Sequence, residues 1–375
     1  MKPTVLVVFG TRPEAIKMSP VVKCLQSRNF HVKVCVTAQH RQMLDQVLNI
    51  FDIVPDYDLN IMRQNQNQFE VVSDILLKIK NIVEVAKPDI VLVQGDTTTT
   101  FVASLAAFYS KVKIGHIEAG LRTGNKYSPF PEEINRRLTA SMADMHFAPT
   151  EKAKQNLLRE NICEDTIYVT GNTAIDALLM TQKMIAVKKL KSFLPEQIRA
   201  IQNKIILVTA HRRESFGGGF ESICKALLDI ADRNSGIEMV YPVHLNPNVQ
   251  DPVKRFLTGR KNIHLIEPLD YVSFVELMDK AYIILTDSGG IQEEAPSLKK
   301  PVLVLRDVTE RIEAVEAKTA KLVGVAREDI LRETEILINS SQEYKKMINA
   351  ENPYGDGKAS EYIADVLTKK LKMSM

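Results

Sequence analysis

The chain has 375 residues, of which 45% are hydrophobic and 25% charged, which is enough for two domains that each bury their own core. Its net charge of +3 comes from 49 basic and 46 acidic residues, a balance that argues against nucleic-acid binding. No apolar run approaches the roughly 18 residues of a membrane span, no secretory leader precedes the first apolar run, and the four cysteines lie scattered, so we expect a cytoplasmic protein without a membrane partner.

Strand-like and helix-like patterns alternate along the first half, which is typical of a mostly parallel α/β sheet. Apolar residues at three- and four-residue steps predict helices over residues 72–83 and 99–109. The predicted strands of this half cover residues 4–9, 32–37, 90–94, 112–117 and 145–148.

A polar, lysine-rich passage at residues 183–203 interrupts this pattern, and a second α/β series follows it. We therefore predict two domains with a boundary near residues 170–173, and we expect ligand binding in the cleft between them. The predicted strands of the second half cover residues 205–209, 238–242, 263–266, 282–286 and 302–305.

Acidic residues follow two strands of the first half closely. Asp96 follows the third predicted strand, and Glu118 follows the fourth. Ligands bind at the carboxyl ends of strands in open parallel sheets, so both acids are placed where a catalytic site would form. Glu118 also belongs to an acid-rich segment, residues 116–137, that includes Glu132 and Glu133. We predict that this segment contributes to an active site.

The loop after the first strand has the chemistry of an anion site. Gly10 permits a tight turn, and Pro13 suits the first turn of a helix. Arg12 and Lys17 could then meet a phosphate at the helix N-terminus. The alternative is a positively charged helix start that binds nothing.

Two loops of the second half also suit anions. Ser288, Gly289 and Gly290 follow a strand and open a helix, where their backbone N–H groups could hold a diphosphate. Glu294, about one turn further on, could accept hydrogen bonds from ribose hydroxyls. Residues 211–219 end another strand with cationic side chains and three glycines.

Familiar cofactor motifs are absent from the sequence. No GxGxxG follows the first strand, and residues 357–359 lack the spacing of a P-loop, so nicotinamide and ATP chemistry are disfavoured. His116 and Glu118 lack a third ligand at a sensible spacing, and we therefore expect no metal. Three histidines that follow apolar stretches are open to a structural or a catalytic role: His40, His211 and His244.

The chain also carries ten longer motifs in a fixed order. They are GTRPEAIKMSP (10–20), AQHRQMLDQVL (38–48), GDTTTT (95–100), GHIEAGLRTG (115–124), PEEINR (131–136), AHRRESFG (210–217), VHLNPNV (243–249), DSGGIQEEAPSL (287–298), TERIEAVEA (309–317) and NPYGDGKAS (352–360). Together they resemble the non-hydrolysing UDP-N-acetylglucosamine 2-epimerases over nearly the whole chain.

The resemblance implies a glycosyltransferase-B-like fold. Two Rossmann-like domains, residues 1–171 and 172–357, would face each other across a cleft, and a C-terminal helix within 358–375 would pack back on the first. The apolar pattern of residues 360–371 is compatible with that helix. A homodimer is also implied, with the helices at 69–86 and 99–109 as candidate interfaces or, alternatively, as core.

The resemblance further implies reversible conversion of UDP-GlcNAc to UDP-ManNAc without a cofactor. UDP would be eliminated to leave 2-acetamidoglucal and would then add back, and the product would supply activated ManNAc for bacterial surface polysaccharide. The alternatives are a 2-epimerase of a modified UDP-GlcNAc, a hydrolysing epimerase that releases ManNAc and UDP, a glycosyltransferase of the same architecture, and a non-catalytic nucleotide-sugar sensor. The intact carboxylate set argues against the last two.

The site residues implied by the resemblance form three groups. The catalytic group is Asp96, Glu118, Glu132 and His211. The UDP-binding group is Arg12, Lys17, Phe274, Ser288, Gly289, Gly290, Glu294 and Arg311. A second, allosteric UDP-GlcNAc site would use Gln39, His40, Gln42, Arg212, Glu214 and His244. Two of these have a structural alternative, because Phe274 could be core and Arg311 could pair with Glu310 or Glu313.

The chain departs from the family pattern at five positions. Gln94 stands where histidine is common, and Leu269 replaces a frequent glutamine, so a side-chain contact to uracil would be lost there. Val308, Ile312 and Lys318 replace the usual Thr, Pro and Gly. Lys318 would be costly if its backbone required a positive φ. We expect these changes to affect affinity and stability more than the type of reaction.

Overall fold

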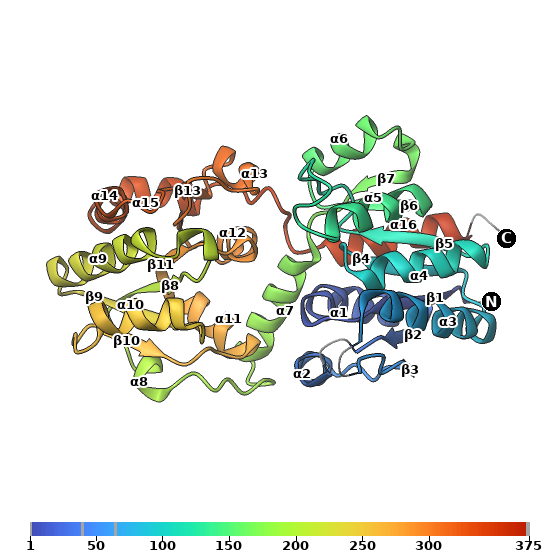
Figure 1. Cartoon of the computed structure of the whole chain (residues 1–375), viewed down its shortest axis with the longest axis horizontal. Coiled ribbons are helices and arrows are strands. Elements are labelled where there is room, and N and C mark those ends of the chain that lie inside the picture. The colour runs from blue at the N-terminus through green and yellow to red at the C-terminus, as the bar shows by residue number, and fades with distance from the viewer. Residues whose placement is uncertain (1, 39–40, 64–65, 373–375) are drawn as a thin grey trace. The chain divides into compact units, whose positions relative to one another are not determined.

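The structure is a computed structural model that describes residues 2–38, 41–63 and 66–372. It divides into two compact α/β units (Figure 1), each described separately below. Unit 1 comprises Met1–Ala177 and Tyr354–Met375, and unit 2 comprises Leu178–Pro353. The division passes through helix α7 (Thr173–Ala186), whose first turn belongs to unit 1.

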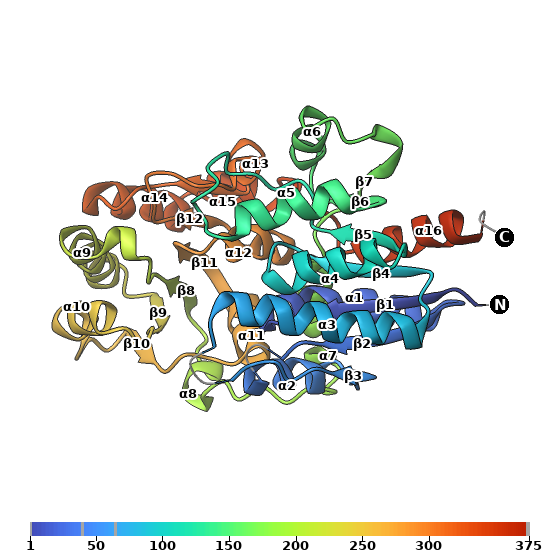
Figure 2. The ribbon, with the colours of Figure 1, turned by 45° about the vertical axis from the view of Figure 1, so that its right-hand side comes forward.

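Unit 1 is built on a seven-stranded parallel sheet with the order β3-β2-β1-β4-β5-β6-β7. Its strands are β1 (Thr4–Phe9), β2 (His31–Val36), β3 (Tyr57–Asp58), β4 (Ile90–Gln94), β5 (Lys113–Ile117), β6 (Met145–Ala148) and β7 (Ile167–Val169). Its helices are α1 (Arg12–Ser27), α2 (Arg41–Ile50), α3 (Gln68–Ala86), α4 (Thr98–Tyr109), α5 (Glu132–Met142), α6 (Glu151–Arg159), the 3-10 turn η1 (Glu164–Thr166) and α16 (Ala359–Lys372). Helices α3, α4 and α5 lie side by side (Figure 2), and α1 packs against α16.

Unit 2 repeats this plan with a six-stranded parallel sheet in the order β10-β9-β8-β11-β12-β13. Its strands are β8 (Lys204–Thr209), β9 (Ile237–Pro242), β10 (Ile263–Ile266), β11 (Ala281–Thr286), β12 (Val302–Val304) and β13 (Ala320–Leu322). Its helices are α8 (Glu196–Arg199), α9 (Gly218–Arg233), α10 (Pro247–Leu257), α11 (Tyr271–Lys280), α12 (Gly289–Glu294), α13 (Ile312–Glu316), α14 (Arg327–Asn339) and α15 (Ser341–Ile348), with 3-10 turns η2 (Arg213–Ser215) and η3 (Ala295–Leu298).

The predicted α/β fold is confirmed, including the C-terminal helix that returns to the first unit. The central strands are buried on both faces, as β4 shows with all five residues covered, and that burial is why continuous apolar runs marked them. At the return, the buried Asp176 carboxylate on α7 accepts hydrogen bonds from the backbone N–H groups of Ala359 (3.2 Å) and Ser360 (2.8 Å). This contact caps the N-terminus of α16.

Both sheets bring the same pair of loops together. In unit 1, β1 lies beside β4, and in unit 2, β8 lies beside β11. The strand order reverses at these positions, and parallel strands end on the same edge of a sheet, so the two following loops lie next to each other. Several predicted site residues lie in or directly after these loops, among them Arg12, Asp96, His211 and Ser288.

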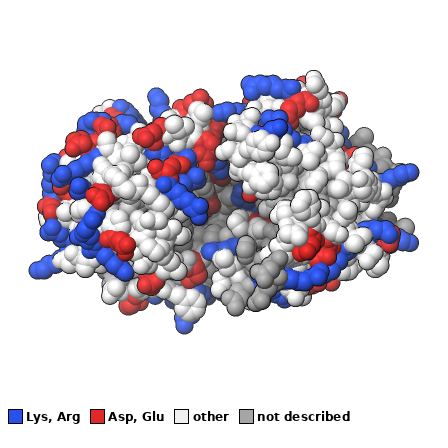
Figure 3. Space-filling view, in the orientation of Figure 1, with Lys and Arg blue, Asp and Glu red and all other residues white. Residues whose placement is uncertain are grey.

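The surfaces of the two units differ in charge. Over unit 2, the face in Figure 3 carries closely interspersed charges of both signs, whereas more of the face of unit 1 is uncharged. None of the helices in the described ranges is both long enough and apolar enough to cross a membrane.

Candidate active site

The first anion loop is held rigidly by a buried carboxylate. Thr11 caps α1, and Glu14 completes a capping box by accepting the backbone N–H groups of Gly10 (3.1 Å) and Thr11 (2.8 Å). The other Glu14 oxygen accepts the Thr97 hydroxyl at 2.7 Å, which ties this loop to the loop after β4. Burial raises the pKa of the Glu14 carboxyl, and these hydrogen bonds oppose the shift.

Arg12, the first residue of α1, is half-buried, and its guanidinium forms no ion pair with any residue that the structure describes. A cation at a helix N-terminus without an internal counter-ion suits an anionic ligand. The loop after β1 thus has the geometry expected of an anion site.

Asp96 follows β4 after Gly95, whose φ is +74°. Its carboxylate forms an ion pair with Arg136 of α5. The amide of Asn135 donates a hydrogen bond of 2.9 Å to the Asp96 backbone carbonyl. The start of α5 thereby fixes both the backbone and the side chain of Asp96.

Glu118 follows β5 with a φ of +64°, an uncommon conformation for a residue with a side chain. Such strain of about 1–3 kcal/mol persists where the surroundings impose it, often at functional sites. The Glu118 carboxylate forms an ion pair with Lys17 on α1, and both side chains are largely buried. The predicted phosphate ligand Lys17 is therefore the partner of the predicted acid/base residue Glu118.

The two adjacent glutamates at the start of α5 have different environments. Glu133 is fully buried and accepts the backbone N–H groups of Thr123 (3.0 Å) and Gly124 (3.2 Å), so it braces the preceding loop. Glu132 is half-buried, and its Oε2 is buried without a hydrogen-bond donor among the described residues. Of the two, Glu132 has the free oxygen that proton transfer requires.

His116 is a residue of this region to which the sequence assigned only a rejected metal role. It lies fully buried in β5, and its Nε2 is 2.7 Å from the carbonyl oxygen of Gly95, next to Asp96. Burial lowers the pKa of the His116 imidazole to about 3, although the Gly95 carbonyl opposes the shift. The neutral ring can therefore donate Nε2–H to Gly95 and hold the loop of Asp96.

In unit 2, His211 follows β8 and is connected to Asp287, the residue after β11. One oxygen of the buried Asp287 carboxylate accepts the backbone N–H groups of His211 (2.5 Å) and Arg212 (2.7 Å). The other lies 3.4 Å from the His211 Nδ1. The His211 ring stacks on His244, with centroids 5.1 Å apart.

The predicted diphosphate loop lies directly after Asp287. Ser288 is the N-cap of α12, and Gly289 and Gly290 form its first turn. A Cβ on Gly289 would lie 3.2 Å from the Arg311 guanidinium carbon, so the glycine leaves room for that cation. Arg311 pairs with the buried Glu293 at 2.7 Å and with Glu310 at 3.3 Å. Its guanidinium therefore adjoins the loop.

Two other predicted UDP ligands of unit 2, Phe274 on α11 and Glu294 at the end of α12, are half-buried. Part of the Phe274 ring is therefore accessible to a ligand.

The predicted allosteric residues are only partly described. Arg212 pairs with Glu310 at 3.7 Å, and Glu214 accepts a hydrogen bond of 2.5 Å from Arg306. His244 is the stacking partner of His211. Gln39 and His40 lie outside the described residues, and Gln42 belongs to α2.

The five departures from the family pattern also have distinct positions. Lys318 has a φ of +62°. It therefore adopts the left-handed backbone conformation that is unfavourable for a residue with a side chain. Ile312 is the first residue of α13, where proline is favoured, and Val308 is exposed. Gln94 is buried at the end of β4, and Leu269 is half-buried just before α11.

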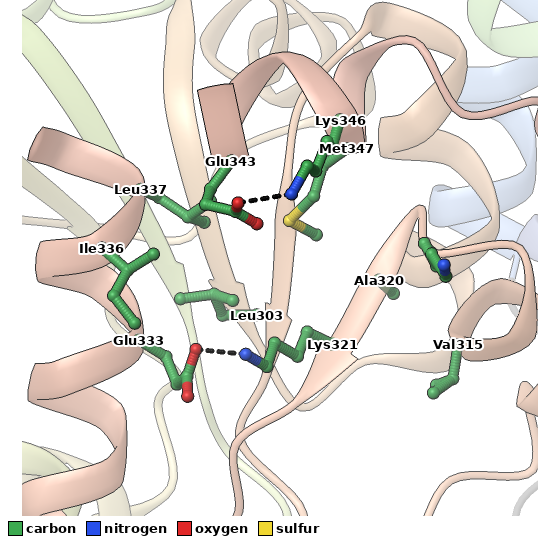
Figure 4. A pocket seen from close by; sticks show the side chains of 11 residues that line it. Leu303, Val315, Ala320, Lys321, Glu333, Ile336, Leu337, Glu343, Lys346 and Met347 are labelled. Atoms are coloured by element: carbon green, nitrogen blue, oxygen red, sulfur yellow. Dashed lines mark hydrogen bonds and ion pairs between the residues drawn. The ribbon is translucent and has the colours of Figure 1, made fainter. Parts of the chain in front are cut away.

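Unit 2 also contains an apolar pocket of about 290 Å³, apart from the predicted site residues (Figure 4). Aliphatic side chains of β12, β13 and the helices α13 to α15 line it. Two ion pairs lie along its wall, Lys321 with Glu333 and Lys346 with Glu343. Among the residues described, no group of three or more His, Cys, Asp or Glu side chains could hold a metal ion.

Comparisons with known proteins point to one enzyme family. The profile of the family described as UDP-N-acetylglucosamine 2-epimerase matches residues 23–368. The UDP-N-acetylglucosamine 2-epimerase of Escherichia coli K12 is 58% identical over 97% of this chain and 98% of its own. The crystal structure of the Neisseria meningitidis UDP-GlcNAc 2-epimerase bound to UDP-GlcNAc has a TM-score of 0.86 and 54% identity, covering 98% of this chain and 100% of that one. A glycotransferase of kitacinnamycin, 10% identical, shares the fold alone, with a TM-score of 0.63 and coverage of 99% and 100%.

Proposed function

The chain belongs to the UDP-N-acetylglucosamine 2-epimerase family, and on that premise we propose that it interconverts UDP-GlcNAc and UDP-ManNAc without hydrolysing them. The observation that carries the proposal is the set of carboxylates Asp96, Glu118 and Glu132, two after neighbouring strands and one at the start of α5. The relative from Neisseria meningitidis that binds UDP-GlcNAc supports the choice of substrate.

The proposed reaction breaks and remakes two bonds. A base removes the proton from C2 of the sugar, the C1–O bond to UDP breaks, and UDP departs with the bonding electrons. The UDP oxygen then adds back to C1 of the 2-acetamidoglucal while C2 receives a proton on the opposite face, which inverts that carbon. This route needs proton-transfer groups and strong binding of UDP, but no redox cofactor.

We assign the proton transfers to unit 1. Lys17 and Arg136 each form an ion pair with one of these carboxylates, Glu118 and Asp96 respectively, and so hold it in place. Glu132 carries a buried oxygen without a donor among the described residues, which suits exchange of a proton with substrate.

We assign UDP binding to Arg12 and Lys17 of unit 1 and to Phe274, Ser288, Gly289, Gly290, Glu294 and Arg311 of unit 2, with His211 at the diphosphate. The support in unit 2 is the loop after β11, where glycine backbone adjoins the Arg311 guanidinium. Backbone N–H groups and a planar cation are the usual partners of phosphate oxygens.

Assembly, regulation and pathway are further parts of the proposal. We propose a homodimer through α3 and α4, because this helix pair exposes several large apolar side chains, among them Phe69, Leu77, Val85, Phe108 and Tyr109. Sedimentation of the purified protein would test it. We also propose activation by UDP-GlcNAc at the second site, and supply of activated ManNAc for surface polysaccharide by a cytoplasmic enzyme.

The direct test of activity is incubation with UDP-GlcNAc in the absence of NAD, followed by NMR. We expect UDP-ManNAc to accumulate to an equilibrium with UDP-GlcNAc. Release of free ManNAc and UDP would show a hydrolysing enzyme instead, and absence of any 2-epimer would refute the proposal.

A variant tests the assignment of Asp96. Asp96→Asn removes the proton-accepting charge but retains the shape, so we expect turnover to vanish while UDP affinity changes only a few-fold. Asp365→Asn, which alters an exposed carboxylate on α16, is the matched control and should keep full activity. Normal turnover of Asp96→Asn would remove Asp96 from the mechanism.

A further inference from the structure

A single buried carboxylate joins the two loops of unit 2 that contain the predicted diphosphate groups. Asp287 follows β11 and is 1% exposed. Its Oδ2 accepts the backbone N–H groups of His211 and Arg212, which follow the neighbouring strand β8. Asp287 therefore fixes the backbone of one loop while its own chain continues into the other, at Ser288.

The second oxygen of Asp287 is directed at the His211 side chain. Asp287 Oδ1 is buried, has no hydrogen-bond partner within the described part of the chain, and lies 3.4 Å from the His211 Nδ1. A carboxylate can only accept hydrogen bonds, so a proton on Nδ1 is the arrangement that satisfies this oxygen. The opposite nitrogen of the ring, Nε2, is then left for a ligand.

The ring of His211 is held from its face as well. His244, from the loop after β9, stacks on it with an angle of 8° between the ring planes and centroids 5.1 Å apart. The His211 side chain is 42% exposed, so a ligand can still reach it. The ring thus has a fixed orientation and an open edge.

The charged groups that face His211 come from three loops. Burial is the largest influence on the pKa of the His211 imidazole and lowers it. Asp287 raises this pKa, whereas His244 and Arg212 lower it further, and the net shift is downward. Arg212 is itself paired with Glu310 at 3.7 Å. Asp287 is therefore the group that opposes the downward shift of the His211 pKa.

We propose that Asp287 is a positioning residue for the reaction: it holds a proton on Nδ1 of His211 and so directs Nε2, as proton acceptor or as N–H donor, toward the departing diphosphate. The proposal rests on the function proposed above. Asp287 does not touch the substrate and acts only through His211. In other carboxylate–histidine pairs, too, the carboxylate accepts a hydrogen bond from one ring nitrogen and so fixes the tautomer of the imidazole.

The first test is independent of activity. We would record ¹⁵N NMR spectra of the histidine rings across pH 5–9 in the full-length protein, with His211→Gln to assign the resonances of His211. We expect Nδ1 of His211 to carry the proton throughout and Nε2 to be the nitrogen that titrates. A neutral His211 with its proton on Nε2 would overturn the proposal, whether or not the protein proves to be an epimerase.

The second test uses a double-mutant cycle. In Asp287→Asn the amide oxygen can still accept the backbone N–H groups of His211 and Arg212, but the amide nitrogen would face Nδ1 and favour the opposite tautomer. We expect kcat for UDP-GlcNAc to fall by about 100-fold, the lower end of typical proton-transfer contributions, with little change in KM. The limb of the kcat–pH profile that belongs to His211 should move to lower pH.

The cycle separates action through His211 from a structural effect. Asp287→Asn should cost almost nothing further in a His211→Gln background, because the partner on which it acts is gone. Additive losses, or an unchanged pH profile, would contradict the proposal. Asp229→Asn, which alters a carboxylate of α9 paired with Arg327, is the matched control and should behave like wild type in every readout.

Discussion

The buried imidazole of His116 should make the stability of the protein sensitive to mild acid. Its pKa is lowered from the ordinary 6.5 to about 3, chiefly by complete burial in β5. Between these two values the unfolded chain binds a proton that the folded chain does not. Stability therefore falls as the pH falls below about 6.5, and this contribution is fully favourable only at higher pH.

The size of the effect follows from the two pKa values. Each pH unit below 6.5 costs about 1.4 kcal/mol while the folded ring remains neutral. At pH 5 the penalty is about 2 kcal/mol, and at pH 4 it is about 3 kcal/mol. A loss of that size is a considerable part of the ~5–15 kcal/mol that stabilises a typical domain.

Urea unfolding followed by far-UV circular dichroism at pH 7.5 and pH 5 would measure it. His116→Gln removes the titrating group but keeps an amide that can donate to the Gly95 carbonyl. We expect wild type to lose about 2 kcal/mol more than His116→Gln between the two pH values. His31→Gln, at the exposed end of β2, controls for the loss of a histidine as such.

The comparison is a difference of differences, so any packing cost of the substitution cancels. If wild type and His116→Gln lose the same free energy of unfolding between pH 7.5 and pH 5, then His116 is not a buried neutral imidazole in the folded protein. The reasoning would also fail if His116→Gln lost more than wild type.

Two further predictions concern the backbone and use the same urea assay. Gly120→Ala should lower the free energy of unfolding by at least about 3 kcal/mol, because the φ of Gly120 is +93° and the new Cβ would lie 2.2 Å from the Ala153 carbonyl oxygen. Gly124→Ala should lower it by only about 1 kcal/mol, because Gly124 has a similar φ of +80° but nothing within 4 Å of the new Cβ. Equal losses would refute the steric argument. Lys318→Gly should stabilise the protein by about 0.5–1 kcal/mol relative to Lys318→Ala, because only glycine relieves the φ of +62°; a less stable glycine variant would contradict this.

The sequence predicted the long buried strands well, and it missed the short ones at the edges. Strand β4, with five buried residues, is a continuous apolar run and could be located to the residue. Strands β3 (Tyr57–Asp58) and β13 (Ala320–Leu322) are two and three residues long, and each pairs on one side only. These short strands are defined by their backbone pairing with one neighbouring strand. They contain no apolar run from which the sequence could have predicted them.

The positions of the candidate acids could be predicted, but their partners could not. Asp96 and Glu118 lie within two residues of the ends of buried strands, which placed them at the ligand edge of the sheet. Their ion pairs with Arg136 and Lys17 join residues 40 and 101 positions apart and depend on how the helices pack. No local pattern encodes such a contact.

The glutamate pair at the start of α5 shows a second limit. Glu132 and Glu133 are chemically identical neighbours, and only the resemblance to a family distinguished them. In the structure Glu133 is completely buried by the loop that it braces, and Glu132 is not. That difference depends on where a loop ten residues away returns, which a single sequence does not reveal.

Epimerisation by elimination and re-addition can be tested with solvent deuterium. The protein would be incubated with UDP-GlcNAc in deuterated water without NAD, and the products examined by NMR. We expect UDP-ManNAc with deuterium at C2, because the proton removed by a carboxylate exchanges with solvent before C2 is reprotonated. UDP-ManNAc that retained the original hydrogen at C2 would contradict it.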